Sequence, residues 1–235
     1  MQLEPPLQRG TLVRRYKRFL ADILSESGES LTIHCPNTGS MQGCLKAGAP
    51  VWYSRSDNKK RKYAYTWEMI EIEPGARIGI NTHLANQLVR EAWQKQRVTE
   101  LTDYVQIEGE KKFGLENSRI DWRLTDKCGA ACYLEVKNVT LVEDGCAYFP
   151  DAVTTRGQKH LRELTHLAQS GTRAMLFFCV QHTAARKVAP ADQIDSLYGE
   201  LLREAVSSGV EVVAYRADVD PSGIELIDSI PLILS

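Results

Sequence analysis

Apolar and polar residues alternate through the first 80 residues with the period of two that β-strands impose, because successive side chains of a strand point to opposite faces. Turn-forming pairs such as Ser27-Gly28 and Pro74-Gly75 interrupt this alternation. The pattern predicts strands at residues 12–24, 31–35, 50–55, 64–72 and 77–80. Five short strands of this kind are typical of an OB-like β-barrel, whose open face commonly receives oligonucleotides.

The period changes at Asn81 from about 2 to about 3.6 residues, which indicates a helix. Leu84, Leu88 and Ala92 form an apolar stripe that continues to about residue 95, and Asn81 is a candidate N-cap. We therefore place a domain boundary here and expect one domain at residues 1–80 and a second at residues 81–235.

The second domain is expected to combine both element types. Its patterns predict strands at 104–113, 117–124, 131–137, 174–180 and 210–215, and helices at 155–169 and 193–208. Strands that first form hairpins and later alternate with helices predict an α/β domain with a mixed sheet. The whole chain is thus expected to be an α+β protein of two domains.

Two neighbouring strands of this domain carry the residues that point most directly to chemistry. Glu135 and Lys137 lie two residues apart and share one face, and Asp121 on the preceding strand can converge with Glu135 across the hairpin turn. Two such carboxylates repel each other, and a divalent cation relieves the repulsion while activating water. A nearby lysine steadies a developing negative charge. Alternating charged residues are also typical of the solvated face of a strand, and the spacing alone leaves that alternative open.

The net charge of −1 conceals a segregation of charge. Residues 9–18 contain five basic residues and no acid, and residues 53–65 contain five basic residues against Asp57 alone. Aromatic residues such as Tyr16 and Tyr63 are interleaved with them, which is typical of surfaces that bind nucleic acid through cations and stacked rings. The candidate contacts are Arg14, Arg15, Lys17, Arg18, Arg55, Lys59, Lys60, Arg61 and Lys62. The alternative is a solvated basic loop beside core aromatics.

The predicted helix at 155–169 begins with polar and basic residues, among them Gln158, Lys159 and His160, whereas Leu161 and Leu164 face the core. A basic helix N-terminus is suited to phosphate, so Lys159 is a further candidate contact. An ordinary amphipathic helix has the same pattern.

The remaining composition excludes several classes of protein. The six cysteines form no C-x-x-C pair, so we expect reduced thiols and set aside a zinc site at His34, Cys35 and Cys44. No apolar run approaches the roughly 20 residues that cross a bilayer, and the N-terminus lacks the order of a signal peptide. We therefore expect a cytoplasmic protein without a membrane partner. The oligomeric state stays open.

Four segments together resemble the sugar fermentation stimulation protein A (SfsA) family, nearly from end to end of the chain. They are residues 34–41 (HCPNTGSM), 117–121 (NSRID), 135–140 (EVKNVT) and 157–161 (GQKHL). The resemblance implies an OB-like barrel joined to a domain like the PD-(D/E)xK nucleases, and a DNA-binding protein. Ile120 replaces the proline of that motif, and Arg162 replaces the tyrosine of the Gln-x-x-x-Tyr helix of some exonucleases.

The same resemblance assigns roles to individual residues. Asp121 and Glu135 are implied as ligands of Mg²⁺ or Mn²⁺, and Lys137 and Gln158 as further catalytic residues. An acid of the first helix often completes the metal shell in such nucleases, which makes Glu91 a third candidate ligand. A glutamate at the edge of the apolar stripe that reaches solvent is the alternative for Glu91.

Two main hypotheses for function follow. One is a DNA-binding protein, regulatory in sugar metabolism as the family name suggests, that holds a divalent metal in a nuclease-like site. The other is an active nuclease, dependent on Mg²⁺ or Mn²⁺, that cleaves phosphodiester bonds. A third, weaker hypothesis is an RNA-directed protein, since an OB face does not distinguish the sugars.

Overall fold

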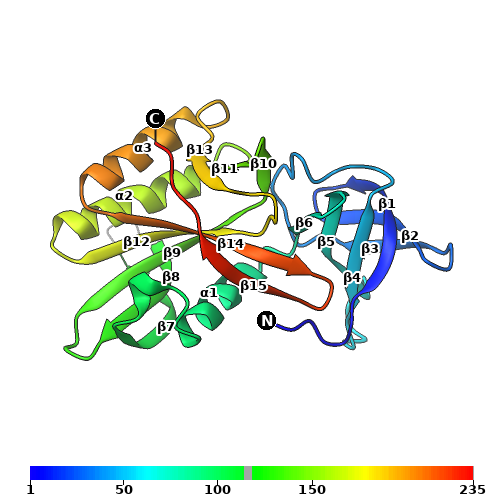
Figure 1. Ribbon diagram of the computed structural model, residues 1–235, viewed down its shortest axis with the longest axis horizontal. Helices are drawn as coiled ribbons and strands as arrows, with labels where there is room; N and C mark the ends of the chain where they lie inside the picture. Colours follow the sequence, from blue (N-terminus) through cyan, green and yellow to red (C-terminus); the bar gives the residue numbers. More distant parts are fainter. Residues whose placement is uncertain (114–117, 235) are drawn as a thin grey trace.

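The computed structural model describes residues 1–113 and 118–234, which form two domains side by side (Figure 1). Asn117, the first residue of a strand predicted above, lies outside the described residues. The chain leaves the first domain at the end of a strand at Gly79 and enters the second through a helix that begins at Leu84.

The first domain is a closed barrel. Its strands are β1 (Gln8–Tyr16), β2 (Leu20–Ser25), β3 (Ser30–His34), β4 (Pro50–Arg55), β5 (Tyr65–Glu73) and β6 (Ala76–Gly79). They are ordered β3-β2-β1-β4-β5-β6, and β3 pairs with β5 between His34 and Thr66, so the first five strands close on themselves. Ile23, Val51 and Trp67 are fully buried in its core. The predicted OB-like barrel is therefore confirmed.

The single strand predicted at 12–24 is wrong, because the chain turns back within it. Lys17 and Arg18 adopt φ angles of 51° and 64°, which are rare for residues other than glycine, and so connect β1 to β2 as a hairpin. The side chain of Arg15 donates to the Arg18 carbonyl at 2.7 Å and stabilises this turn. None of the usual turn residues occurs between Tyr16 and Phe19, so the sequence carried no signal for the hairpin.

The second domain is built on a six-stranded mixed sheet. Its strands are β7 (Tyr104–Phe113), β8 (Ser118–Asp126), β9 (Ala131–Val139), β12 (Arg173–Val180), β14 (Glu211–Asp220) and β15 (Gly223–Ser229), in the order β15-β14-β12-β9-β8-β7. The pairs β9–β12 and β12–β14 are parallel, and the outer pairs are antiparallel. The predicted α/β domain with a mixed sheet is confirmed.

Helices cover both faces of this sheet (Figure 1). The helix α1 (Leu84–Gln94) packs Leu88 and Val89 on one face, in a core that includes Leu134 and Val136 of β9. The helices α2 (Thr155–Gln169) and α3 (Ser196–Ser207) pack on the other face, in a core that includes Leu161. Because side chains of β9 alternate between the two faces, Glu135 and Lys137 face α2 while their neighbours face α1.

The helix boundaries agree with the sequence pattern to different degrees. The structure has α2 at the predicted residues, with Thr154 as an N-cap that accepts the Gly157 N–H at 3.0 Å. The N-cap of α1 is His83 rather than Asn81. The Asn81 side chain instead donates to Glu68 of the barrel at 2.8 Å, and thereby ties the start of the second domain to the first.

Five elements were not predicted, among them the edge strand β15 (Gly223–Ser229) of the large sheet. The strands β10 (Leu141–Glu143), β11 (Cys146–Phe149) and β13 (Lys187–Pro190) form a small separate sheet, and a 3-10 turn at Thr99–Leu101 precedes β7. All six cysteines are free thiols, as expected, and five of them are buried. Within the described residues, none of the helices combines the length and the apolar character needed to cross a bilayer.

Candidate metal and nuclease-like site

The sheet of the second domain divides between β8 and β9. The β8–β9 ladder ends at the pair Trp122–Leu134, whereas β8 stays paired with β7 beyond that point and β9 stays paired with β12 to its end. Asp121 and Glu135 are the next residues along the two strands, so they stand at the fork where β8 and β9 separate. A backbone N–H that loses its strand partner needs another acceptor, and the Asp121 carboxylate accepts the Val136 N–H at 2.8 Å.

Asp121 is held from both sides of this fork. Its Oδ2 accepts the Val136 N–H, and its Oδ1 accepts the side-chain amide of Asn86 on α1 at 3.0 Å. Asn86 in turn accepts the indole N–H of Trp122 at 3.1 Å, which fixes the orientation of its amide. Burial raises the pKa of Asp121, and the negative charge of Glu135 raises it further. The two carboxylates are thus close enough to repel each other, as the sequence predicted.

Glu135 is 3 % exposed and lies at the centre of a polar cluster. Its Oε1 accepts a hydrogen bond from Lys137 Nζ at 2.6 Å and contacts Nδ1 of His160 on α2. Burial raises the pKa of Glu135, but Lys137 and His160 outweigh this effect and bring the pKa below its ordinary value. Its other oxygen, Oε2, is buried without a hydrogen-bond partner in the part of the chain that the structure describes.

His160 is a member of this cluster that sequence reasoning did not select. Its side chain is buried, and its Nδ1 lies 3.1 Å from Lys137 Nζ as well as against Glu135. It belongs to the segment that resembles the family motif, but only the packing of α2 on the sheet brings it to Glu135. Asn86 was missed for the same reason, because a helical pattern alone does not show which polar residue faces which strand.

The structure places Glu91 away from this cluster. Its carboxylate pairs with the N-terminal ammonium at 2.6 Å and with Lys95 at 3.0 Å, and these partners lower its pKa against the effect of burial. Five residues separate Glu91 from Asn86, which is a rotation of about 140° around the helix. The residue of α1 that contacts Asp121 is therefore Asn86 and not Glu91, and the expectation of Glu91 as a ligand is not supported by this geometry.

Gln158 also has a different position from the one expected of a catalytic residue. Its amide donates to both oxygens of Asp195, at 2.9 and 3.1 Å. Asp195 is the N-cap of α3 and accepts the backbone N–H groups of Tyr198 and Thr154 as well. Gln158 therefore links α2 to α3. Its side-chain amide is bonded to Asp195 rather than to Asp121, Glu135 or Lys137.

Several of the predicted nucleic-acid contacts are already engaged with the barrel itself. Arg15 donates to the carbonyls of Asn37 and Gly39, and Arg18 donates to the carbonyl of Thr38. These two side chains hold the 37–39 loop in place; Arg15 is half-buried, whereas Arg18 remains exposed.

Two further arginines have polar partners on the barrel surface. Arg14 pairs with Asp22 at 2.9 Å, and Arg61 donates to the Thr66 hydroxyl at 2.9 Å. Both residues remain exposed, so they stay predicted contacts of nucleic acid, although these partners restrict the movement of their side chains.

The other predicted contacts remain at the surface. Lys17, Arg55, Lys59, Lys60 and Lys62 are exposed, and Lys62 lies over the Tyr63 ring at 5.7 Å. Lys159 is half-buried on α2, next to His160. The exposed cations thus gather mainly on the barrel loop between β4 and β5.

The donor set at the fork fits a hard divalent cation. It offers two carboxylates, one of them with an unpartnered buried oxygen, and carboxylate oxygen is the ligand that Mg²⁺ and Mn²⁺ prefer. No group of three or more His, Cys, Asp or Glu side chains arranged for a metal occurs among the described residues. A cation here would accordingly take its remaining ligands from water, backbone or a bound phosphate.

Comparison with known proteins agrees with this architecture. A family profile described as "SfsA N-terminal OB domain" matches residues 13–80, and one described as "Sugar fermentation stimulation protein RE domain" matches residues 83–223. A "Sugar fermentation stimulation protein homolog" of Shewanella frigidimarina (strain NCIMB 400) is 55% identical over 223 residues, 95% of each chain. A homolog of the same description from Shewanella sp. (strain MR-4) is 54% identical over 232 residues, 99% of each chain.

A solved structure shares the fold over almost the whole length. It is described as "The structure of Pyrococcus Furiosus SfsA in complex with Ca2+" and superposes with a TM-score of 0.89 at 27% identity, covering 99% of this chain and 98% of that chain. The two profile matches, the relatives above half identity and this superposition agree with the resemblance seen in the sequence motifs. The chain belongs to the SfsA family.

Proposed function

We propose that this protein binds DNA and holds Mg²⁺ or Mn²⁺ between Asp121 and Glu135. The observation that carries the proposal is the Oε2 atom of Glu135, which is buried and unpartnered beside a second carboxylate whose pKa is raised. An unsatisfied buried polar atom costs about 1–3 kcal/mol, and more when it is charged. A cation at the fork removes this cost and the repulsion between the two acids.

Two further observations support a divalent cation. The Pyrococcus relative is described as a complex with Ca²⁺, which shares the preference of Mg²⁺ for oxygen ligands. Asn86 and the Val136 N–H hold the Asp121 carboxylate in one orientation, so that its remaining lone pairs are preorganised. When bound, such a cation supplies Lewis-acid polarisation of a phosphoryl oxygen and lowers the pKa of a coordinated water.

DNA is the proposed partner because of the barrel. Its fold is one that commonly binds oligonucleotides, and its β4–β5 loop presents the exposed lysines at positions 59, 60 and 62. These cations attract phosphates without regard to sequence. The proposal includes a regulatory role in sugar metabolism, which the description of the family as sugar fermentation stimulation proteins supports.

A second candidate function, cleavage of phosphodiester bonds, is favoured by Lys137. Its side chain is only 11 % exposed and lies 2.6 Å from Glu135, where it can donate to the negative charge that develops on a phosphate. A protein that only binds DNA has no evident need for a largely buried lysine at this point. Lys137 and the two carboxylates are the arrangement that the nuclease motif requires.

One series of reactions tests both functions. Purified protein is incubated with single- and double-stranded DNA and RNA, each with Mg²⁺, Mn²⁺ or EDTA, and binding is read on native gels while cleavage is read on denaturing gels. The double variant Asp121→Asn with Glu135→Gln should lose stoichiometric Mn²⁺ binding in calorimetry. The exposed Asp218→Asn is the matched control and should bind Mn²⁺ like the wild type. Mn²⁺ binding that survives in the double variant would exclude this site.

Lys137→Ala separates the enzyme from the binding protein. In an enzyme, this variant should lose metal-dependent cleavage and keep DNA affinity within a few-fold. A wild type that shifts DNA but leaves every substrate intact with both metals excludes catalysis. Cleavage that persists undiminished in Lys137→Ala and Asp121→Asn belongs to a contaminant or to another site.

A further inference from the structure

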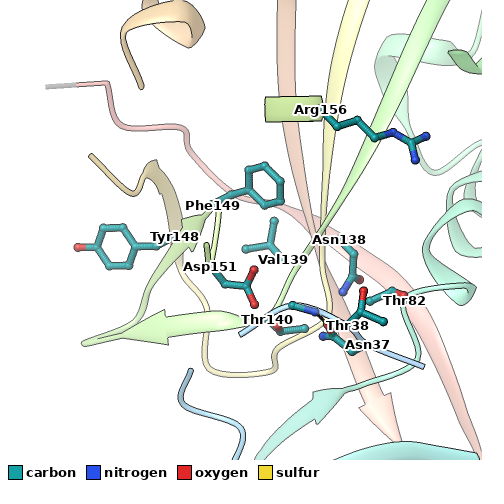
Figure 2. A pocket seen from close by; sticks show the side chains of 11 residues that line it. Asn37, Thr38, Thr82, Asn138, Val139, Thr140, Tyr148, Phe149, Asp151 and Arg156 are labelled. Carbon is teal, nitrogen blue, oxygen red and sulfur yellow. Dashed lines mark hydrogen bonds between the residues drawn. The ribbon is translucent and has the colours of Figure 1, made fainter. Parts of the chain in front are cut away.

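A polar pocket of about 410 Å³ lies between the two domains (Figure 2). Its walls are the 37–39 loop of the barrel, the end of β9 with the residues that follow it, the end of β11, and the first turn of α2. The volume falls in the range of about 300–1,000 Å³ that is typical of small-ligand sites. None of the site residues described above lines it, yet β9 and α2 both carry residues of the fork.

The loop that forms one wall is held rigidly from both domains. Arg15 donates to the carbonyls of Asn37 and Gly39, at 3.0 and 2.9 Å. From the second domain, the Asp151 carboxylate accepts the Met41 N–H at 3.0 Å. A Cβ atom at Gly39 would lie 2.5 Å from an Asp151 oxygen, so a larger residue here would displace the carboxylate that accepts the Met41 N–H. The wall is therefore preorganised, which lowers the cost of binding a ligand.

Two side-chain amides offer unused donors in this pocket. Asn37 is 5 % exposed, and its Oδ1 accepts the Gly39 N–H at 2.9 Å. Asn138 is anchored in the same way, because its Oδ1 accepts the Gln181 amide at 2.5 Å. In both residues the Nδ2 group donates no hydrogen bond to any of the residues that the structure describes. Each amide thus has its orientation fixed by one atom and a free donor on the other.

The opposite end of the pocket carries a free cation. Arg156 is exposed and makes no hydrogen bond or ion pair with the described part of the chain. Figure 2 shows it at one end of the pocket, with Asn37 and Thr38 at the other. Arg156 precedes His160 by four residues, so both lie on one face of α2 about one turn apart. Because His160 contacts Glu135, the pocket adjoins the fork.

We propose that this pocket holds one unpaired nucleotide of the strand whose neighbouring phosphate lies at Asp121 and Glu135. The inference rests on the proposed function and narrows its substrate to single-stranded or locally unpaired DNA. Arg156 binds the phosphate of that nucleotide, and the free amides of Asn37 and Asn138 donate to acceptors on its base. Asp151 repels phosphate and lies away from Arg156 (Figure 2). It therefore favours the orientation of the nucleotide in which the phosphate lies at Arg156. A base within a duplex reaches such a recess only after leaving its stack.

The test measures the affinity of a fluorescent 12-nucleotide single strand and of the matching duplex by anisotropy in Ca²⁺, the cation of the Pyrococcus complex, so that the fork is occupied. A denaturing gel verifies that both strands stay intact. Arg156→Ala should weaken single-strand binding about tenfold. Asn37→Asp keeps the oxygen that accepts the Gly39 N–H but replaces the free donor with negative charge. It should weaken single-strand binding about tenfold and duplex binding less than about threefold. Gln169→Glu makes the same chemical change at the far end of α2 and should leave both affinities unchanged. Equal melting temperatures verify the fold of each variant.

The outcomes separate this inference from the proposed function. If the wild type binds DNA while Arg156→Ala and Asn37→Asp bind the single strand as tightly as the wild type does, the pocket inference is overturned and the proposed function stands. If the wild type binds neither strand form, both are overturned. Saturable binding of 5′-dAMP that needs Arg156, without oligonucleotide binding, assigns the pocket to a free nucleotide and also overturns the inference.

Discussion

Mn²⁺ should stabilise the folded protein, and Asp121→Asn should remove most of that stabilisation. A ligand that binds only the folded state at 100 times its dissociation constant adds about 2.7 kcal/mol to the free energy of unfolding. For a chain of this size, 1 kcal/mol shifts the melting temperature by roughly 2–4 °C, so the wild type should melt about 5–10 °C higher with Mn²⁺ than with EDTA.

The structure indicates how much of this shift the variant keeps. Asp121 supplies one of only two carboxylates at the fork, and we expect its loss to weaken Mn²⁺ binding about 100-fold, or about 2.8 kcal/mol. The same Mn²⁺ concentration then only equals the dissociation constant and adds about 0.4 kcal/mol, a shift of about 1 °C. Asp218→Asn, an exposed carboxylate on β14, should retain the full shift.

The raised pKa of Asp121 adds a pH dependence with a definite sign. In the metal-free protein this carboxyl binds its proton more tightly when folded, first because of burial and then because of Glu135. Its ionisation therefore costs stability as the pH rises from its ordinary pKa to the raised value. Mn²⁺ competes with that proton, so Mn²⁺ affinity should fall as the pH decreases through the raised pKa.

Scanning calorimetry with Mn²⁺ and with EDTA measures these shifts for the wild type and both variants. An Mn²⁺-dependent shift in Asp121→Asn equal to that of the wild type would refute the reasoning. So would the absence of any shift in the wild type at millimolar Mn²⁺.

Three further predictions concern other parts of the molecule. Burial lowers the pKa of His182 to about 4, so the free energy of unfolding measured by urea titration should fall by about 3 kcal/mol from pH 7 to pH 4. The variant His182→Asn should show a smaller fall; a fall equal to that of the wild type would show that His182 is not its cause. Asp195→Ala removes the N-cap of α3 and the acceptor of Gln158, and should cost about 2–4 kcal/mol by the same titrations; a cost below about 0.5 kcal/mol argues against that role. Reversing the charges of Lys59 and Lys60 should weaken DNA binding for all sequences and reduce the log-log salt slope by about 0.9 per lost duplex contact; an unchanged slope places the DNA elsewhere.

Local periodicity was sufficient for much of the second domain. The helix α2 begins and ends at the predicted residues because a capping threonine and a regular leucine spacing agree there. Asp121, Glu135 and Lys137 converge as expected because a period of two and a short hairpin leave few other arrangements. The class of the barrel was predictable from its short strand-like segments and the turns between them, although its first two strands were predicted as one.

Side-chain partners far apart in the sequence were not predictable. Arg15 and Arg18 have the composition of phosphate contacts, but loop carbonyls about 20 residues later take up their guanidinium groups. The same contacts support positive φ angles at a turn without glycine. Gln158 was assigned to catalysis, but the structure pairs it with Asp195, 37 residues further along.

The sequence by itself determined the two-domain architecture, the class of each domain and the pair of acids with their lysine, because these depend on period, turns and neighbouring strands. Tertiary structure alone decided that β8 and β9 separate at Asp121, that Asn86 rather than Glu91 contacts it, and that His160 reaches Glu135. The apolar stripe of a helix shows which face is buried, but polar residues on either edge of that stripe could contact the neighbouring strand. Only the packing of α1 and α2 against opposite faces of one sheet selects which polar residue arrives at the fork.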